Sequence, residues 1–254
     1  MLKAKLGIAP IAWWNDDLSE LSDDVSLEEC LRQASVAGFT GMETGRRFPM
    51  DMTELGPVLK RYGISVCGSW FSGLLLDGDI SAEKDRIAEQ MEFFKAAAAP
   101  CIVYGETARS IQGDRSKPLS TKPKLSADEI KTYGRKMTAF AEWCADQGMP
   151  ISYHHHMAAV IETEPELDLL MKHSGSALPL LFDAGHMAFA GGDVLRVRRR
   201  RASGDRQASC SHQPRAYERC ADGSDQRARS LQGLVPRRCR QRRLHCSRRR
   251  VARF

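Results

Sequence analysis

The stretch PISYHHH (150–156) is an apolar run that ends in three consecutive histidines. The run has the length and composition of a short buried strand, and the histidines stand at its C-terminal end. Alternate side chains of an extended chain point to opposite faces, so His154 and His156 share one face and His155 points to the other. We therefore expect His154 and His156 to act together at a site and His155 to be structural.

Other apolar runs of strand length recur along the chain, and helical patterns separate them. The runs are KLGIAPIAW (5–13), TGMETG (40–45), ISVCGSWF (64–71), PCIVYGET (100–107) and LPLLFDAGH (178–186). The helical patterns fall at about 26–38, 52–62, 81–98, 127–147 and 164–174, with Ser26 and Ser126 as expected N-caps. Such repeated units predict a parallel α/β fold of the (β/α)8 TIM-barrel type, here incomplete with about six βα units.

The alternative fold is a doubly wound open sheet, which carries a glycine-rich phosphate-binding turn after its first strand. The first run here leads instead into WWNDDL (13–18). Polar residues follow strand after strand, and in a barrel the C-terminal strand ends share one rim, which favours the barrel. These residues are Asn15, Asp16, Glu43, Arg46, Trp70, Glu106, His154, His156, Asp183 and His186.

Asp183 in LLFDAGH (180–186) offers a carboxylate at the end of the strand that follows the histidine strand. A carboxylate together with imidazoles suits a divalent ion such as manganese, cobalt, iron or zinc. Two alternatives stay open. Asp183 can instead be the N-cap of a following helix, and Glu106 can instead form a surface ion pair with Arg109.

Composition sets broad limits on the protein. With 254 residues, 42% of them hydrophobic, the chain has material for a sizeable core. It contains no apolar run of about 18 residues and no signal peptide, so we expect a cytoplasmic protein without a membrane partner. Its eight cysteines show no CxxC spacing, and those in the first 195 residues are expected to be reduced thiols.

Charge divides the chain at GGDVLRVRRRR (191–201). Residues 1–195 carry 19 Lys and Arg against 28 Asp and Glu, whereas residues 196–254 carry 19 Arg, no Lys and 4 acids. We expect a partial barrel over 1–194 and a disordered tail over 195–254. An Arg-rich nucleic-acid binder is one interpretation of the tail, but aromatic residues for base stacking are sparse. A shifted reading frame explains the absence of Lys better, so nucleic acid is not the expected partner.

Six motifs of the chain are long and specific. They are GIAPIAWWNDDL, ETGRRFP, SWFSG, VYGETARSIQGDRSKPLSTKPKL, YHHHMAAVIET and LLFDAGHMAFAGGD. Together they closely resemble the inosose dehydratases, lyases of inositol catabolism within the xylose isomerase-like TIM barrels. The resemblance extends from about residue 5 to about residue 194.

The resemblance implies a metal-dependent hydro-lyase that converts a small polyol ketone, 2-keto-myo-inositol (inosose), to a trihydroxycyclohexane-1,2-dione. The expected cofactor is a divalent metal, Mn or Co, that polarises the ketone while a base removes the neighbouring proton. The resemblance assigns His154 and Asp183 to the metal and His156, Glu106 and His186 to catalysis. The substrate-binding candidates are Trp13, Asn15, Glu43, Arg46 and Trp70.

The chain also departs from the family pattern. Ala9 and Ala184 stand where an asparagine and a threonine are expected, and His154 stands where relatives carry a carboxylate. Two further strand–helix units, expected to bring another metal histidine and a carboxylate, are missing, which predicts an unstable and inactive chain. The alternatives to a dehydratase are a sugar or keto-inositol isomerase or epimerase on the same barrel, and a non-enzymatic remnant. The oligomeric state stays open.

Overall fold

The computed structural model describes residues 5–16 and 25–195, so the predicted tail, apart from Leu195, lies outside the described residues. The strands are β1 (Gly7–Ile8), β2 (Gly41–Glu43), β3 (Ser65–Gly68), β4 (Trp70–Gly73), β5 (Ile102–Glu106), β6 (Ile151–His154) and β7 (Leu180–Leu181). The α-helices are α1 (Leu27–Val36), α2 (Met52–Tyr62), α3 (Ile80–Ala96), α4 (Ala127–Asp146), α5 (Glu164–Lys172) and α6 (Ala184–Phe189). Two 3-10 turns, η1 (Pro10–Ala12) and η2 (Leu119–Thr121), complete the described elements.

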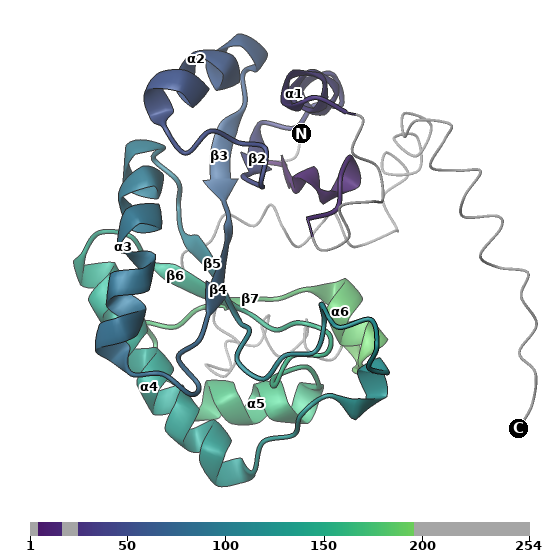
Figure 1. Ribbon diagram of the computed structural model, residues 1–254, viewed down its shortest axis with the longest axis vertical. Helices are drawn as coiled ribbons and strands as arrows, with labels where there is room; N and C mark the ends of the chain where they lie inside the picture. Colours follow the sequence, from purple (N-terminus) through teal and green to yellow (C-terminus); the bar gives the residue numbers. More distant parts are fainter. Residues whose placement is uncertain (1–4, 17–24, 196–254) are drawn as a thin grey trace, which may run out of the picture. The chain divides into compact units, whose positions relative to one another are not determined.

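Every strand pairing in the described part is parallel. One sheet has the order β1-β2-β3 and the other has the order β4-β5-β6-β7. Parallel neighbours need a crossover connection, and α1, α2, α3, α4 and α5 supply the crossovers between successive strands (Figure 1). The predicted α/β architecture with six strand–helix units is therefore confirmed, with β3 and β4 together preceding α3.

The third predicted strand, 64–71, is split into β3 and β4. Gly68 ends β3 with φ at 153°, a backbone conformation that side chains disfavour, and Ser69 separates the two strands. The register between β2 and β3 also shifts between Met42 and Glu43. At this irregularity the chain leaves the first sheet, in which β3 pairs with β2, and enters the second sheet, in which β4 pairs with β5.

Two other predicted strands are shorter than expected. The run 5–13 forms β1 only at Gly7–Ile8, because Pro10 has no N–H for a ladder and starts the turn η1. The run 178–186 forms β7 only at Leu180–Leu181, because Asp183 caps α6 immediately afterwards.

Helix starts follow the polar residues that the sequence supplies. Ser26, Asp51, Asp79 and Ser126 accept a backbone N–H in the first turn of α1, α2, α3 and α4. Each such cap contributes about 1 kcal/mol to helix stability. The predicted caps at Ser26 and Ser126 are confirmed, and Ser126 forms a full capping box with Glu129.

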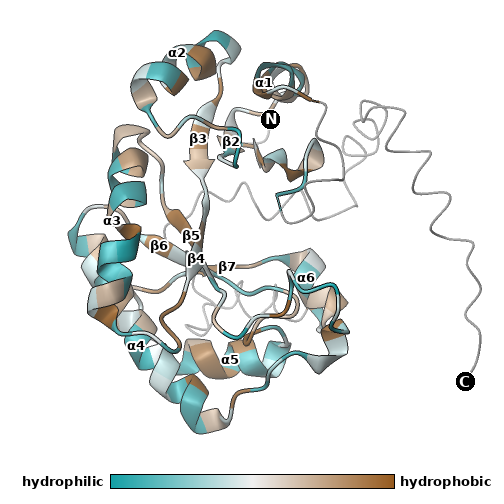
Figure 2. Ribbon diagram, viewed as in Figure 1, coloured by the Kyte–Doolittle hydropathy of each residue, from teal (hydrophilic) through white to brown (hydrophobic). Residues whose placement is uncertain are grey.

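One hydrophobic core joins both sheets to the helices that cover them. Behind the second sheet, the rings of Tyr104 and Phe140 lie 5.7 Å apart between β5 and α4. Strands β5 and β6 carry hydrophobic colour, whereas the helices alternate between hydrophilic and hydrophobic residues (Figure 2). Within the described ranges, no helix combines the length and apolarity needed to cross a membrane.

Candidate functional site

Three histidines meet where β6 and β7 end. The ligating nitrogens of His154, His156 and His186 can be chosen so that all lie within 4.8 Å of one another, a separation suited to holding a metal ion. The imidazole rings of His156 and His186 are 4.0 Å apart, and those of His154 and His186 are 5.3 Å apart. The structure brings His154 and His156 together, as the alternation of the strand predicts, and places His186 beside them; their use as a functional site stays a prediction.

His154 has the electrostatics of a metal ligand. Its Nδ1 is buried and has no hydrogen-bond partner among the described residues. Burial lowers the pKa of His154 well below its ordinary value, and His186, His155 and His156 lower it further. The imidazole is therefore neutral near pH 7 and keeps a lone pair available to a cation.

His156 has a defined tautomer. Its Nδ1 lies 2.9 Å from the carbonyl oxygen of Met157. A carbonyl only accepts hydrogen bonds, so Nδ1 carries the proton and Nε2 keeps its lone pair. His156 therefore offers Nε2 as an acceptor for a proton or a cation.

His155 has a different role, as the alternation of the strand predicts. It is fully buried, and its Nε2 accepts the backbone N–H of Asp183 at 3.3 Å. This bond ties the end of β6 to the end of β7 and fixes the spacing between the elements that carry the other histidines. The structural role expected for His155 fits these contacts.

His186 lies in the first turn of α6, beside Asp183. Oδ1 of Asp183 accepts the backbone N–H of His186 at 2.7 Å and caps the helix. Burial and the nearby His156 lower the pKa of His186, whereas the charge of Asp183 opposes this shift. The N-cap alternative for Asp183 is thus confirmed. The capping bond uses one oxygen and leaves further lone pairs on the carboxylate. The assignment of Asp183 to the metal therefore stays a prediction.

Trp70 forms one wall of the histidine cluster. Its ring stands edge-on to His154 at 5.6 Å and to His156 at 5.7 Å. The indole lies across Gly105 of β5, where an added Cβ would sit only 1.9 Å from Cη2 of Trp70. Trp70, one of the five predicted substrate-binding residues, therefore contacts the histidines directly.

The other four candidates belong to the loops and strands of the first sheet. Nε of Arg46 pairs with Oδ1 of Asp16 at 3.2 Å, which joins the loop after β2 to the segment after η1. The indole N–H of Trp13 donates to Gln33 of α1 at 2.8 Å. Asn15 lies three residues after η1, and Glu43 is the last residue of β2. Their assignment to the substrate stays a prediction.

Glu106 faces away from the histidines. It shares a face of β5 with Tyr104, which is paired in register with Tyr153, whereas His154 lies on the opposite face of β6. The carboxylate of Glu106 accepts the N–H groups of Leu76 and Ala108 and is 2% exposed. The structure therefore does not bring Glu106 to the cluster, because strand alternation places it on the helix side of the sheet.

The alternative that Glu106 pairs with Arg109 is wrong. Arg109 donates instead to Asp77 and Glu129. Burial raises the pKa of Glu106, and its hydrogen bonds to Ala108 and Leu76 oppose that shift. Glu106 has the contacts of a group that positions loops.

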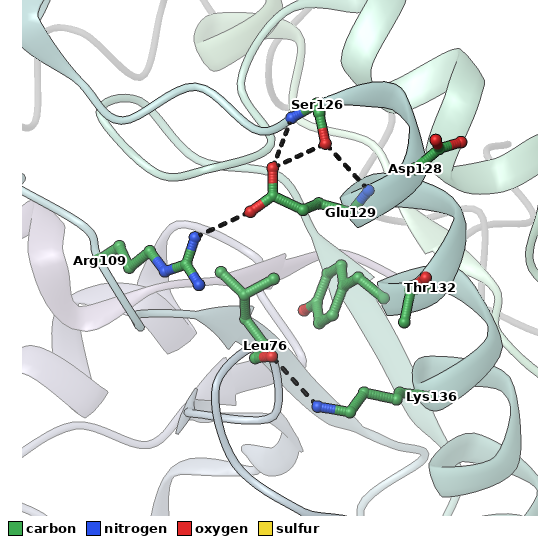
Figure 3. Close-up of a pocket in the computed structure, with 8 residues that line it drawn as sticks. Leu76, Arg109, Ser126, Asp128, Glu129, Thr132 and Lys136 are labelled. Atoms are coloured by element: carbon green, nitrogen blue, oxygen red, sulfur yellow. Dashed lines mark hydrogen bonds and ion pairs between the residues drawn. The ribbon is translucent and has the colours of Figure 1, made fainter.

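A pocket of about 310 Å³ lies beside α4 (Figure 3). None of the residues that line it belongs to the histidine cluster. Its lining residues are Leu76, Arg109, Ser126, Asp128, Glu129, Thr132, Tyr133 and Lys136. Both cations are engaged, since Arg109 binds Asp77 and Glu129, and Lys136 donates to the carbonyls of Leu75, Leu76 and Gly78. Nothing in the sequence motifs indicated this pocket, and its charged groups stabilise the surrounding loops.

Sequence reasoning missed Glu162. This residue is 8% exposed, and its Oε2 accepts the N–H of Ala158, in the turn that follows His156. Ala158 has a left-handed backbone with φ at 59°. The signal available was a carboxylate six residues after His156, and that spacing alone does not reveal a contact.

The arrangement suits a divalent cation. Three imidazoles, two with lowered pKa values and one with a fixed tautomer, supply neutral nitrogen donors, and Asp183 adds a carboxylate beside them. The buried, unpartnered Nδ1 of His154 indicates a missing partner, because buried polar atoms are usually satisfied. The residues present therefore fit a metal ion.

Solved structures with a similar backbone identify the fold. The chain aligns with the IolI protein, solved with a bound zinc atom, with a TM-score of 0.58 and 15% identity over 80% of this chain and 70% of that one. A fusion of a xylose isomerase-like TIM barrel with 4-hydroxyphenylpyruvate dioxygenase aligns with a TM-score of 0.53 and 16% identity over 78% of this chain and 30% of the other. The fold is that of the xylose isomerase-like TIM barrels, as the sequence predicted.

Proteins of similar sequence give more detail than the fold does. The rhizopine catabolism protein MocC of Rhizobium meliloti is 37% identical over 195 residues, which are 77% of this chain and 60% of the relative. An inosose dehydratase of Geobacillus thermodenitrificans is 36% identical over 197 residues, which are 77% of this chain and 66% of the relative. The chain is a homologue of the inosose dehydratases and spans 60–66% of the length of these two relatives. No known family profile matches it.

Proposed function

We propose that the protein is a metal-dependent dehydratase that removes water from 2-keto-myo-inositol and forms a trihydroxycyclohexane-1,2-dione. The observation that carries the proposal is the cluster of His154, His156 and His186 at the strand ends of this barrel. Its relatives at 36% identity include an enzyme named inosose dehydratase.

The cation is held by His154, His186 and Asp183 in this proposal. His154 contributes the buried Nδ1 that lacks a partner in the described part, and His186 of α6 lies beside it, with the two rings 5.3 Å apart. Two nitrogens and one oxygen suit manganese or cobalt and leave positions open for the substrate. When bound, such an ion supplies positive charge beside the ketone and makes the neighbouring C–H more acidic.

His156 is the group that moves the proton. Its Nδ1 is engaged by Met157, so Nε2 accepts the proton from the carbon next to the ketone. The C–H electron pair then forms the new C=C bond while the β-hydroxyl leaves. The hydroxyl takes the proton from Nε2 and departs as water, which returns His156 to its starting state. The resulting enol tautomerises to the dione.

Trp70 covers one side of the cluster and limits access of bulk water.

The experiment compares three variants in the metal-stripped and metal-restored protein. His154→Ala removes a donor, and Asp183→Asn keeps an oxygen to cap α6 while losing the charge. Both are expected to lower bound manganese or cobalt and activity together. His156→Gln is expected to keep the metal and to lower turnover by about 10²–10⁴-fold, as loss of a general base does.

Metal content is measured by mass spectrometry and the product by absorbance of the dione. If His154→Ala and Asp183→Asn both keep full metal occupancy, the ligand assignment is wrong. If the metal-loaded protein converts 2-keto-myo-inositol to an isomer without forming the dione, the barrel serves an isomerase.

A further inference from the structure

We propose that Glu162 is a positioning residue that fixes the tautomer and ring orientation of His156 through the Met157–Ala158 peptide group. The inference rests on the proton-transfer role proposed for His156. It concerns a carboxylate that lies within the motif YHHHMAAVIET but has no role assigned by the sequence analysis.

One peptide group connects the two side chains. The carbonyl of Met157 and the N–H of Ala158 belong to the same planar unit, and in a trans peptide they point in opposite directions. The carbonyl accepts Nδ1–H of His156 at 2.9 Å, and the N–H donates to Oε2 of Glu162 at 3.0 Å. Glu162 and the His156 ring therefore hold the peptide plane from its two sides.

The orientation of this peptide plane carries a conformational cost. Ala158 has φ at 59°, in the left-handed region that costs a non-glycine residue about 1 kcal/mol or more. Glu162 is 8% exposed, so its charged hydrogen bond to Ala158 is shielded from water and is correspondingly strong. The carboxylate thus stabilises the strained turn that places the Met157 carbonyl against the imidazole.

Neighbouring bonds fix the remainder of the turn. The carbonyl of Ala158 accepts the N–H of Ile111 at 3.2 Å and the hydroxyl of Ser110 at 3.3 Å. The N–H of Ala159 donates to the carbonyl of His156 at 3.3 Å. Glu162 itself is anchored, since its N–H donates to Oε2 of Glu166, a residue of the first turn of α5. The turn is therefore held on both sides, and Glu162 supplies the charged acceptor for its Ala158 N–H.

The chemical consequence is a defined proton position on His156. A carboxylate that accepts the Ala158 N–H polarises the peptide and makes the Met157 carbonyl a better acceptor. The imidazole then keeps its proton on Nδ1 and presents the Nε2 lone pair. This relay resembles the carboxylate–histidine pairs that orient ligands in metal sites, with one peptide group inserted between the carboxylate and the ring.

The test is the tautomer of His156 in the metal-free full chain, measured by long-range ¹H–¹⁵N NMR and assigned with His156→Gln. In the wild type, Nδ1 is expected at the protonated position and Nε2 at the unprotonated one. Glu162→Met removes the acceptor at nearly constant volume and is expected to shift His156 toward the Nε2–H form. Glu162→Gln keeps an acceptor oxygen and is expected to retain the wild-type tautomer.

Two controls separate positioning from general damage. Glu83→Ala removes another buried carboxylate that accepts a loop N–H, that of Leu74, and should leave the His156 signals unchanged. Glu162→Asp shortens the side chain by one methylene and supplies a second acceptor-loss variant if Glu162→Met does not fold. An Nε2–H tautomer in the wild type, or no shift in either acceptor-loss variant, would overturn the proposal.

The NMR readout needs neither metal nor substrate, so it distinguishes the two proposals. If the tautomer responds to Glu162 but the chain forms no dione, the dehydratase proposal fails while the positioning role stands. In the active enzyme, Glu162→Met is expected to lower kcat about 10- to 100-fold with little change in KM, and Glu162→Gln to recover most of it.

Discussion

Gly105 allows the indole of Trp70 to lie across β5. A methyl group at this position would sit 1.9 Å from Cη2 of Trp70, far inside contact distance. We expect Gly105→Ala to displace the indole, to cost about 1–3 kcal/mol of unfolding free energy, and to raise KM for the substrate. Denaturant unfolding measures the first effect, and near-ultraviolet circular dichroism reports the displaced tryptophan.

Gly113→Ala is the matched control for this prediction. A Cβ at Gly113 meets no atom within 4 Å. The control should leave the dichroism and KM unchanged. If both alanine variants behave alike, the contact between Gly105 and Trp70 does not determine the wall of the site.

At the residue scale, the sequence predicts side chains well where alternation is short and regular. The separation of His155 from His154 and His156 follows from the two-residue period of a strand. The same period places Glu106 on the face of β5 that carries Tyr104, but it does not say which face that is. The structure shows that Tyr104 pairs with Tyr153 of β6, so Glu106 lies on the helix side of the sheet and the histidines lie on the other side. Glu162 escaped prediction because its contact depends on the left-handed turn at Ala158.

Buried acidic side chains accept hydrogen bonds from the loop between β4 and α3. Glu83 accepts the N–H of Leu74, Glu106 accepts the N–H of Leu76, and Tyr104 donates to Glu83 at 2.8 Å. Lys136 of α4 donates to three carbonyls of the same loop. These contacts attach the loop to β5, α3 and α4, so the loop should report on the ionisation of Glu106.

The stability of the wild type should depend on pH through Glu106. Burial raises its folded-state pKa above the ordinary 4.5, so the folded state holds the proton more tightly than the unfolded state. The stabilisation is complete below about pH 4.5 and is lost as the pH rises through the folded pKa. We expect the unfolding free energy of the wild type, relative to Glu106→Gln, to fall over that window.

Urea unfolding at a series of pH values tests this expectation. The exposed Glu92, 72% accessible and paired with Lys95, provides the control variant Glu92→Gln. Its difference from the wild type should not follow the trend of Glu106→Gln. A wild-type stability that rises through the window relative to Glu106→Gln would reverse the sign of the argument.

At the scale of elements, helices are better predicted than strands. The range 52–62 of α2 matches its prediction because amphipathic spacing and a cap residue act within the segment itself. Strand lengths are set by neighbours and by backbone breaks. The end of β1 at Ile8, just before Pro10, and the break at Gly68 are local features that hydrophobic patterning does not reveal.

At the scale of the molecule, two sheets share one core. Met42 and Val66 of the first sheet belong to the same buried cluster as Tyr104 and Tyr153 of the second. The sequence predicted the succession of strand–helix units, because each unit carries its own pattern. It did not predict the division into two sheets, because hydrogen bonding between strands is not encoded in hydrophobic spacing.

A shared core predicts one cooperative unfolding transition for the described part, although its hydrogen bonding is divided. If one sheet unfolded, buried side chains of the other would become exposed, at a free-energy cost of about 25 cal/mol per Å² of apolar surface.

The tryptophans allow the test, because Trp13 and Trp14 lie beside the first sheet whereas Trp70 and Trp143 lie on β4 and α4. Replacing one pair at a time by phenylalanine leaves a fluorescence probe for each region. Coincident denaturant midpoints, matching far-ultraviolet circular dichroism, are expected from both probes. Two separated midpoints would show that the sheets are independent units and that the histidine cluster depends on the second sheet alone.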